Sequence, residues 1–395
     1  MRALFVAPYL PTPGSGGRTR LVNFMERLAR LHDVQIVAFT ARDQDPADNP
    51  YPGVAVPPPP VRARPSGARG VARFYREKLL DPLPSFASWM SSSAMIEAVR
   101  TACETFRPDV VQVETTEMGQ YLPFIPSSVA RALDMQDVAS RWFGRVRRFG
   151  SAQERALMGV ELLKTRRYEK TCARIPDVVY VSSPVERAFY AKLTGVDPLE
   201  VPNGVDTHAF APMQVDEGRK TLLFVGPLTY DANLDGLKWF IHDVLPYIRS
   251  REPDVRLDVV GTPVDLEVPS EVRLLGRVED VRPHVARAAV SIVPVRVGTG
   301  TRYKILEALS MQRAVVSTTV GAEGLGVING EHVMIADDPQ DFARAVIRLL
   351  DEPELRAHLG VAGRAHVVPR FDWKPLVARV DESWARAVEA TRRAH

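Results

Sequence analysis

Short apolar runs alternate along the chain with longer segments whose apolar positions follow a helical period. In the first half, the runs that predict strands are residues 3–7, 34–39, 110–113 and 178–181. The helical patterns of this half fill residues 19–31, 92–106 and about 153–173. Strands that alternate with amphipathic helices are typical of α/β folds with parallel sheets. The first half is therefore predicted to be α/β.

The alternation stops near residues 201–217, where the turn signal Asn203-Gly204 precedes polar, proline-interrupted sequence. It then resumes with strand-like runs at residues 221–225, 256–260, 272–275, 290–294, 314–317 and 333–335. This second series predicts a doubly wound sheet of its own.

These breaks divide the chain into four parts. We predict an N-terminal domain at residues 1–200, a linker at 201–217 and a C-terminal domain at 218–370. The remaining residues, 371–395, place Trp373, Val377, Val380 and Trp384 mostly three or four positions apart. That spacing predicts a last helix with one apolar face, which we expect to pack on the N-terminal domain.

Composition and charge narrow the class of protein. The chain has 395 residues, of which 45% are hydrophobic and 25% charged, as in ordinary globular proteins. A net charge of +3 gives no reason to expect nucleic acid as a partner. Cys103 and Cys172 have neither metal-ligand spacing nor a disulfide framework, which fits a reducing cytosol. Since no apolar run is long enough to span a membrane, we expect a cytoplasmic protein.

Basic side chains gather between residues 141 and 167, where arginine and lysine outnumber glutamate. A solvated helical face is the simplest account. Attraction to anionic lipid or to a phosphorylated acceptor is the alternative, and it leaves open a peripheral contact at the inner face of the membrane.

The segment from Gly298 to Glu307 carries the clearest chemistry. On a helix that starts near Thr301, Gly300, Lys304 and Glu307 share one face. Backbone N–H groups at a helix start and a lysine suit a diphosphate, and a carboxylate one turn later suits the two hydroxyls of a ribose. The alternative is a solvated Glu307 paired with Lys304. Apolar neighbours on both sides of Glu307 favour burial, and a buried charge needs a partner.

Glycine-rich turns follow other predicted strands, at the sheet edge where open α/β folds bind ligands. Gly226 follows one strand, residues 274–278 end another, and residues 319–325 follow a third. The backbone of 274–278 is suited to reading the edge of a base. In the first half, Gly14, Gly16 and Gly17 precede a helix and, with Arg18 and Arg20 beside them, suit an anion. A tight turn is the alternative for each segment.

Carboxylates also follow strands in the first half. Asp134 lies near a strand end and is our candidate for binding a hydroxyl or acting as a base. Asp137 fits a helix N-cap, and Glu114 is a further option because it also ends a strand.

Taken together, these segments resemble a GT-B glycosyltransferase, similar to the large family 4 of nucleotide-sugar-dependent enzymes. The matching pieces are Gly16-Gly17, residues 201–206, residues 298–307 and residues 321–325. The resemblance implies two Rossmann-like domains that face each other across a cleft, with the last helix crossing back to the first domain. It also implies a C-terminal domain that binds the donor and an N-terminal domain that binds the acceptor.

Site residues follow from the resemblance. Glu307 matches the glutamate that binds the ribose, Arg277 and Val278 match the segment that contacts the base, and Gly16 and Gly17 match the loop that meets the phosphates. The turn beside the diphosphate and sugar corresponds to Gly321, Ala322, Glu323, Gly324 and Leu325.

The chain departs from the family at two places. Thr299 stands where the family often has a second glutamate, and the arginine and lysine that often follow the strand-end glycine are missing after Gly226. We infer that Arg302 and Lys304 supply the missing positive charge. The pattern Asp134, Asp137, Ser140 is similar to a subgroup that acts in bacterial exopolysaccharide synthesis.

We therefore expect a retaining glycosyltransferase that moves a sugar from a UDP- or GDP-sugar to a hydroxyl of a glycan, a lipid-linked or a small-molecule acceptor. Asp134, Arg302 and Lys304 are the predicted catalytic residues, and no metal or other cofactor is expected, since basic side chains stabilise the leaving diphosphate. One alternative is a nucleotide-sugar epimerase of the same architecture. The other is a non-catalytic sugar-nucleotide-binding protein, which Thr299 keeps open. The sequence does not identify the sugar, the base, the acceptor or the oligomeric state.

Overall fold

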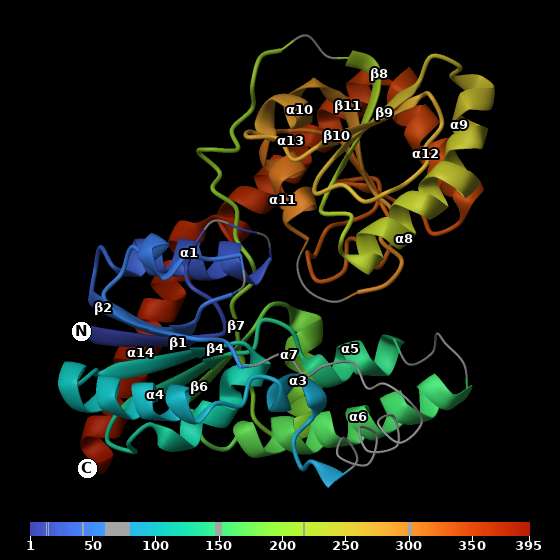
Figure 1. Ribbon diagram of the computed structural model, residues 1–395. Coiled ribbons are helices and arrows are strands. Elements are labelled where there is room, and N and C mark those ends of the chain that lie inside the picture. The colour runs from blue at the N-terminus through green and yellow to red at the C-terminus, as the bar shows by residue number, and fades with distance from the viewer. Residues whose placement is uncertain are drawn as a thin grey trace. The chain divides into compact units, whose positions relative to one another are not determined.

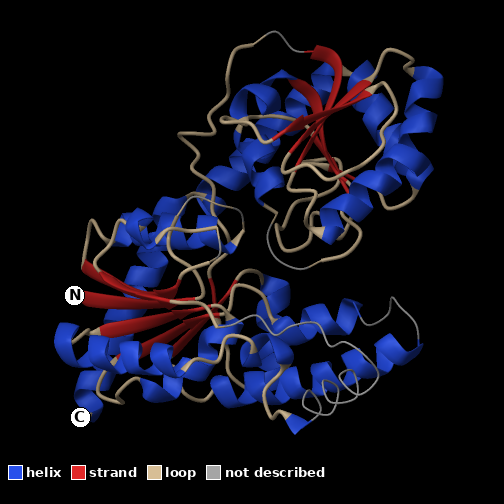
Figure 2. Ribbon diagram, viewed as in Figure 1, coloured by secondary structure: helices blue, strands red, loops and turns tan. Residues whose placement is uncertain are grey.

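The computed structural model describes residues 1–12, 14, 16–41, 43–59, 80–146, 152–215, 218–298 and 302–395. The described chain divides into two compact units (Figure 1). Unit 1 contains Met1–Pro202 together with Val377–His395, and unit 2 contains Asn203–Leu376. Each unit has one parallel sheet with helices packed around it (Figure 2), so the predicted α/β class with two Rossmann-like domains is confirmed. The cleft between the domains stays a prediction.

The described part of unit 1 has a seven-stranded parallel sheet in the order β3-β2-β1-β4-β5-β6-β7. Its strands are β1 (Arg2–Ala7), β2 (Asp33–Phe39), β3 (Gly53–Val56), β4 (Val110–Glu114), β5 (Ala130–Asp134), β6 (Val178–Val181) and β7 (Leu199–Glu200). Its helices are α1 (Gly17–Leu28), η1 (Pro46–Asp48), α3 (Ser85–Ser88), α4 (Ser93–Phe106), η2 (Thr116–Phe124), α5 (Ala139–Val146), α6 (Ala152–Cys172) and α7 (Pro184–Thr194). Strand order reverses between β1 and β4, where ligands of such sheets bind.

The described part of unit 2 has a six-stranded parallel sheet in the order β10-β9-β8-β11-β12-β13. Its strands are β8 (Gly218–Val225), β9 (Arg256–Val260), β10 (Val272–Gly276), β11 (Ala288–Val293), β12 (Val315–Ser317) and β13 (Met334–Ile335). The helices that follow are α8 (Asp231–Trp239), η3 (Phe240–Val244), α9 (Leu245–Arg251), α10 (Arg282–Arg287), α11 (Tyr303–Ser310), α12 (Pro339–Asp351), α13 (Pro353–Phe371) and α14 (Trp373–Ala394). Here the order reverses between β8 and β11.

Helix α14 begins in unit 2 and continues into unit 1. Its Trp384 is fully buried, and the indole Nε1–H donates a 3.0 Å hydrogen bond to Oε1 of Gln112 on β4. The hydroxyls of Ser383 and Tyr180, on β6, lie 2.6 Å apart. These contacts fasten the end of the chain to the sheet of unit 1. Within the described residues, no helix combines the length and the apolar character needed to cross a bilayer.

Candidate functional site

The predicted donor residues of unit 2 gather where the strand order reverses, after β8 and β11. Gly226 follows β8 with φ +153°, Asn233 is in the first turn of α8, and Lys304 is in the first turn of α11. The Lys304 ammonium donates a 2.8 Å hydrogen bond to Oδ1 of Asn233. A Cβ at position 226 would lie 2.7 Å from Nδ2 of Asn233 and 2.8 Å from Nζ of Lys304. Only glycine therefore allows both side chains to pack against this strand end.

Lys304 and Glu307 are both held in surroundings that disfavour charge. Burial lowers the pKa of Lys304 to about 7, with a further lowering from Arg302 and an opposing effect of Glu307. Burial raises the pKa of Glu307 to about 7, against the opposing effect of Lys304. The Lys304 ammonium also lies 4.6 Å from the centre of the Phe224 ring. An anion placed beside Lys304 would favour its protonated form, because an opposite charge favours the charged state of a base.

Arg302 immediately precedes α11 and lies close to the glycine-rich segment. Gly298 adopts φ +138°, and a Cβ there would lie 2.5 Å from Nη2 of Arg302. Among the described residues, Nε of Arg302 is buried without a hydrogen-bond partner. Two positions of the predicted site, Thr299 and Gly300, lie outside the described residues.

The turn at 321–325 follows β12 and packs against the end of β11. The Gly321 N–H donates a 2.9 Å hydrogen bond to Oγ1 of Thr318, which in turn donates to the carbonyl of Val295. A Cβ on Gly321 would lie 2.8 Å from the carbonyl oxygen of Val293, so this turn too requires glycine. Ala322 is buried, Glu323 is half-buried and Gly324 has φ +80°. The Leu325 carbonyl lies 2.8 Å from Nε2 of His366 on α13.

The predicted base-contacting residues lie at the same sheet edge, on the other side of β8. Gly276, with φ +70°, ends β10, and its carbonyl accepts a 2.9 Å hydrogen bond from the Gly261 N–H after β9. Arg277 is exposed and Val278 is half-buried in the apolar cluster of this unit. The structure thus brings Arg277, Val278, Gly226, Lys304 and the 321–325 turn to one edge of one sheet.

In unit 1, Gly16 and Gly17 lie where the order of that sheet reverses. Gly16 precedes α1 with φ +60°, and Gly17 is the first residue of the helix. A Cβ on Gly17 would lie 2.8 Å from Oε1 of Gln136 and would overlap the hydroxyl of Tyr9. Burial, followed by the charge of Glu114, raises the pKa of Tyr9. The glycine loop is therefore packed on a buried polar group at this edge.

Asp134 lies at the end of β5 and is 1% exposed. Its Oδ2 accepts a 2.7 Å hydrogen bond from Nε of Arg20 on α1, and its Oδ1 accepts a 3.0 Å bond from the Gln136 N–H. Arg20 also donates a 3.0 Å bond to the carbonyl of Pro202. These contacts give Asp134 a structural role in holding α1 to the sheet, and its catalytic role stays a prediction.

Sequence reasoning missed Asn233, and it placed Arg20 beside the glycines as part of an anion cradle, whereas the structure buries Arg20 in an ion pair with Asp134. Arg20 carried a signal, because it shares the buried face of α1 with Phe24 and Leu28, and a charge on an apolar face implies a buried partner. Asn233 carried no such signal, since asparagine near a helix start is ordinary.

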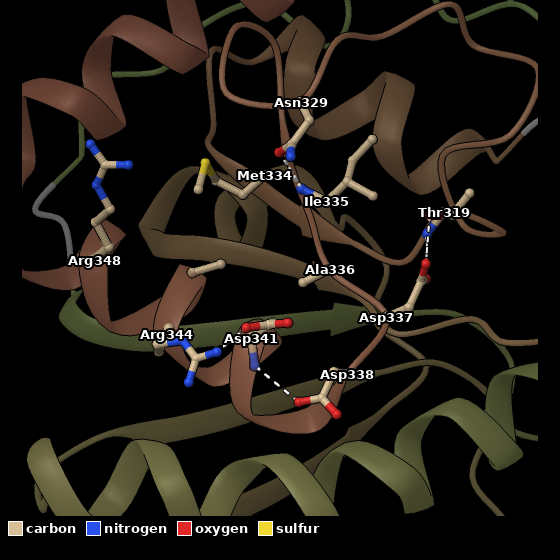
Figure 3. A pocket seen from close by; sticks show the side chains of 11 residues that line it. Thr319, Asn329, Met334, Ile335, Ala336, Asp337, Asp338, Asp341, Arg344 and Arg348 are labelled. Carbon is tan, nitrogen blue, oxygen red and sulfur yellow. Dashed lines mark hydrogen bonds and ion pairs between the residues drawn. The ribbon is translucent and has the colours of Figure 1, made fainter.

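A cavity of about 700 Å³ opens beside β13 and α12 (Figure 3). Asn329, Thr319, Arg344 and Arg348 are among its lining residues. Its lining includes Thr319, the first residue of the 319–325 turn, but the Thr319 hydroxyl donates to Asp337, Arg344 is paired with Asp341 and Arg348 with Glu352. We therefore keep the β8–β11 edge, rather than this cavity, as the candidate site.

Comparison with known proteins shows what the chain is similar to. Residues 219–352 match the family described as "Glycosyl transferases group 1". The chain is 28% identical over 228 residues to the phosphatidyl-myo-inositol mannosyltransferase of Mycolicibacterium smegmatis, covering 54% of this chain and 57% of that protein. It is 27% identical over 307 residues to the GDP-mannose-dependent alpha-(1-6)-phosphatidylinositol monomannoside mannosyltransferase of the same organism, covering 66% and 80%. The match to the first relative thus spans a little over half of that protein's length.

Two solved structures share the fold over nearly the whole chain. Sucrose-phosphate synthase from Thermosynechococcus elongatus superposes with a TM-score of 0.74 at 17% identity, covering 99% of this chain and 100% of that one. Anabaena Alr3699/HepE in complex with UDP superposes with a TM-score of 0.64 at 12% identity, covering 98% and 100%. These comparisons do not favour the epimerase alternative, and the resemblance to GT-B glycosyltransferases is confirmed. The chain has the fold of GT-B glycosyltransferases, and its residues 219–352 match the glycosyl transferases group 1 family.

Proposed function

We propose that this chain is a hexosyltransferase that moves a sugar from a UDP- or GDP-sugar to an acceptor hydroxyl with retention of configuration. The observation that carries the proposal is the joint placement of Gly226, Lys304 and Glu307 where the strand order of unit 2 reverses. A glycine that admits close approach, a half-buried lysine and a half-buried carboxylate one helical turn later match a sugar nucleotide in shape and charge.

In the proposed reaction, the departing group is a nucleoside diphosphate, and negative charge grows on the oxygen that leaves the sugar. We assign Lys304 and Arg302 to face this charge, whereas the Gly321 N–H, also predicted for this task, is bonded to Oγ1 of Thr318. Fixed positive groups in a partly dry site lower the barrier, since they need no reorganisation as the charge develops. Because two basic side chains can do this, we propose that transfer needs no metal ion and continues in the presence of a chelator.

The proposal allows two bases in the donor, uracil and guanine. The mannosyltransferase relative named above is GDP-mannose-dependent, which supports guanine. The structural neighbour HepE was solved in complex with UDP, which supports uracil. A thermal-shift panel of UDP, GDP and their sugars separates the two, because a ligand at 100 times its Kd stabilises the folded form by about 2.7 kcal/mol.

We further propose a lipid-linked acceptor and a peripheral contact with anionic membranes. The relatives that support this are named as mannosyltransferases of phosphatidyl-myo-inositol and of phosphatidylinositol monomannoside. On this chain, α6 and the residues just after it expose basic side chains next to an exposed leucine: Leu163, Arg166, Arg167, Lys170 and Arg174. Arg141 is not part of this surface, since it is buried in an ion pair with Glu186. Co-sedimentation with vesicles that contain or lack anionic lipid tests the contact.

The central test is transfer and donor-hydrolysis activity of Lys304→Ala and Glu307→Ala. We expect each variant to lose about 100-fold or more of kcat/KM, as when a charge-stabilising donor is removed from other enzymes. Lys238→Ala is the matched control, because Lys238 is an exposed lysine of the same unit. If both site variants keep wild-type rates, the proposed site is wrong.

A further inference from the structure

Asn233 is a buried amide between two of the proposed donor-binding elements. It is 6% exposed and lies in the first turn of α8. Its Nδ2 donates a 3.0 Å hydrogen bond to the carbonyl of Pro227. A carbonyl can only accept, so this bond fixes which end of the amide is the nitrogen. Oδ1 is thereby turned toward Lys304, whose ammonium donates to it at 2.8 Å.

The contact joins segments 71 positions apart in the sequence. This contact requires a glycine at position 226, because a Cβ there would overlap the Asn233 amide and the Lys304 ammonium. A lysine side chain has four rotatable bonds and would otherwise sample many positions. The amide, the glycine and the Phe224 ring hold the ammonium at one place on the strand end.

A neutral acceptor and a carboxylate would leave different net charges beside the ligand. A carboxylate at this distance would cancel the charge of Lys304 and would itself repel an anion. An amide orients the ammonium and takes one of its three donors without cancelling its charge. The charged groups that also face Lys304 are Arg302 and Glu307, which act on it in opposite directions.

We propose that Asn233 is a positioning residue that fixes the Lys304 ammonium beside Gly226 and, because it is uncharged, keeps the full positive charge available to the diphosphate of the donor. This inference rests on the proposed function. It adds to that function a residue that acts on the ligand through Lys304.

The test replaces the amide by a carboxylate of the same shape. Asn233→Asp keeps an acceptor for Lys304 but loses the donor to the Pro227 carbonyl, so we expect its melting temperature to lie below that of the wild type, as should that of Asn233→Ala, which loses the same bond. We expect the affinity of Asn233→Asp for UDP or GDP to fall by about tenfold or more, since a unit charge within hydrogen-bonding distance offsets the field of the ammonium. Its affinity for the uncharged nucleosides uridine and guanosine should stay the same. Asn233→Ala, which frees Lys304 without adding a charge, should show a smaller loss for the diphosphates.

Gln340→Glu is the matched control, because it makes the same amide-to-acid change at an exposed position of unit 2. We expect it to bind both ligand types as the wild type does. The inference is overturned if Asn233→Asp binds the diphosphate as tightly as the wild type, or if it loses diphosphate and nucleoside affinity equally, since the second result marks a structural defect. A wild-type protein that binds no nucleoside diphosphate overturns the proposed function itself.

Discussion

Arg20 and Asp134 form a buried ion pair in unit 1, with Nε of the arginine 2.7 Å from Oδ2 of the aspartate and side chains that are 0% and 1% exposed. The pair joins α1, which begins with Gly17, to the end of β5. The same arginine packs its guanidinium 4.9 Å from the centre of the Phe24 ring. The predicted phosphate loop is therefore anchored through a helix whose buried charge is neutralised in the sheet.

Removal of one partner of this ion pair should lower the stability of the fold. Asp134→Asn leaves Arg20 without its carboxylate in the interior, so we expect the free energy of unfolding to fall by about 3–5 kcal/mol. Urea unfolding followed by circular dichroism measures it. Asp197→Asn breaks the exposed pair with Arg187 and should leave the free energy of unfolding nearly unchanged. A variant Asp134→Asn that is as stable as the wild type yet inactive would instead favour the catalytic role.

The indole of Trp384 should anchor α14 to unit 1. Its ring meets that of Phe5 edge-on at 5.7 Å, and its N–H satisfies the buried Gln112 amide. Trp384→Ala should therefore lower the free energy of unfolding by about 3–5 kcal/mol, mainly because the lost indole leaves a cavity in the core of unit 1. Trp384→Phe keeps most of the volume but leaves Oε1 of Gln112 without this donor, which should cost about 1–3 kcal/mol.

Leu31→Ala, at a position 58% exposed, is the control for lost apolar surface in the same unit. Chemical denaturation gives the free energy of unfolding of the three variants, and we expect that of Trp384→Ala to be the lowest. Equal stability of Trp384→Ala and Leu31→Ala would show that α14 contributes little to the fold.

The sequence predicted the elements that follow simple periodicity and missed those that do not. The strands at β1, β2, β4 and β6 were predicted because most of their residues are apolar. The sequence located β5, which reads Ala-Arg-Ala-Leu-Asp, only by its end at Asp134. It missed β3, which begins at a glycine, and β7, which consists of Leu199 and Glu200 only. Strands such as these are formed by pairing with a neighbour rather than by their own composition.

The site was predictable where chemistry follows from local spacing. Lys304 and Glu307 share a helix face, and the strand-end glycines follow from the parallel sheet. The contact of Lys304 with Asn233 was not predictable, because it depends on how two distant helices approach the same strand end. The burial of Asp134 likewise depends on a partner 114 positions away.

Gly226 should tolerate no side chain. Its φ of +153° is strained for other residues, and a Cβ would press on the Asn233 amide and the Lys304 ammonium. We expect Gly226→Ala to lower the free energy of unfolding by about 1–3 kcal/mol. It should also weaken UDP or GDP binding, because Lys304 must move. Gly330→Ala is the matched control, since Gly330 has φ +77° with nothing within 4 Å of an added Cβ.

Calorimetric titration and thermal unfolding of Gly226→Ala and Gly330→Ala separate the loss of nucleotide affinity from the loss of stability. Backbone strain alone would destabilise both proteins and leave nucleotide affinity intact. If Gly226→Ala binds the diphosphate as tightly as Gly330→Ala, the strand-end glycine does not serve the ligand.

Nucleotide affinity should depend on pH through Lys304. The pKa of this lysine is lowered to about 7, so the free protein loses the ammonium charge as the pH rises above that value. A diphosphate binds the charged form better, and binding then requires uptake of a proton. By linkage, the Kd of UDP or GDP should rise between pH 7 and 9, by at most about tenfold per pH unit. In this range the second ionisation of the terminal phosphate approaches completion, and Glu307, with a pKa of about 7, becomes increasingly charged.

Lys304→Arg removes the part of this effect that is due to the lysine, because a guanidinium stays protonated throughout the range. We expect its Kd to rise less than that of the wild type from pH 7 to 9, even if its affinity at pH 7 is weaker, and any remaining rise is due to Glu307. Titration calorimetry in buffers of different ionisation enthalpy counts the protons taken up on binding. The wild type should take up more protons at pH 8 than the arginine variant. A flat wild-type profile, or the same proton uptake in both proteins, would mean that Lys304 is already fully charged in the free protein or does not meet the diphosphate.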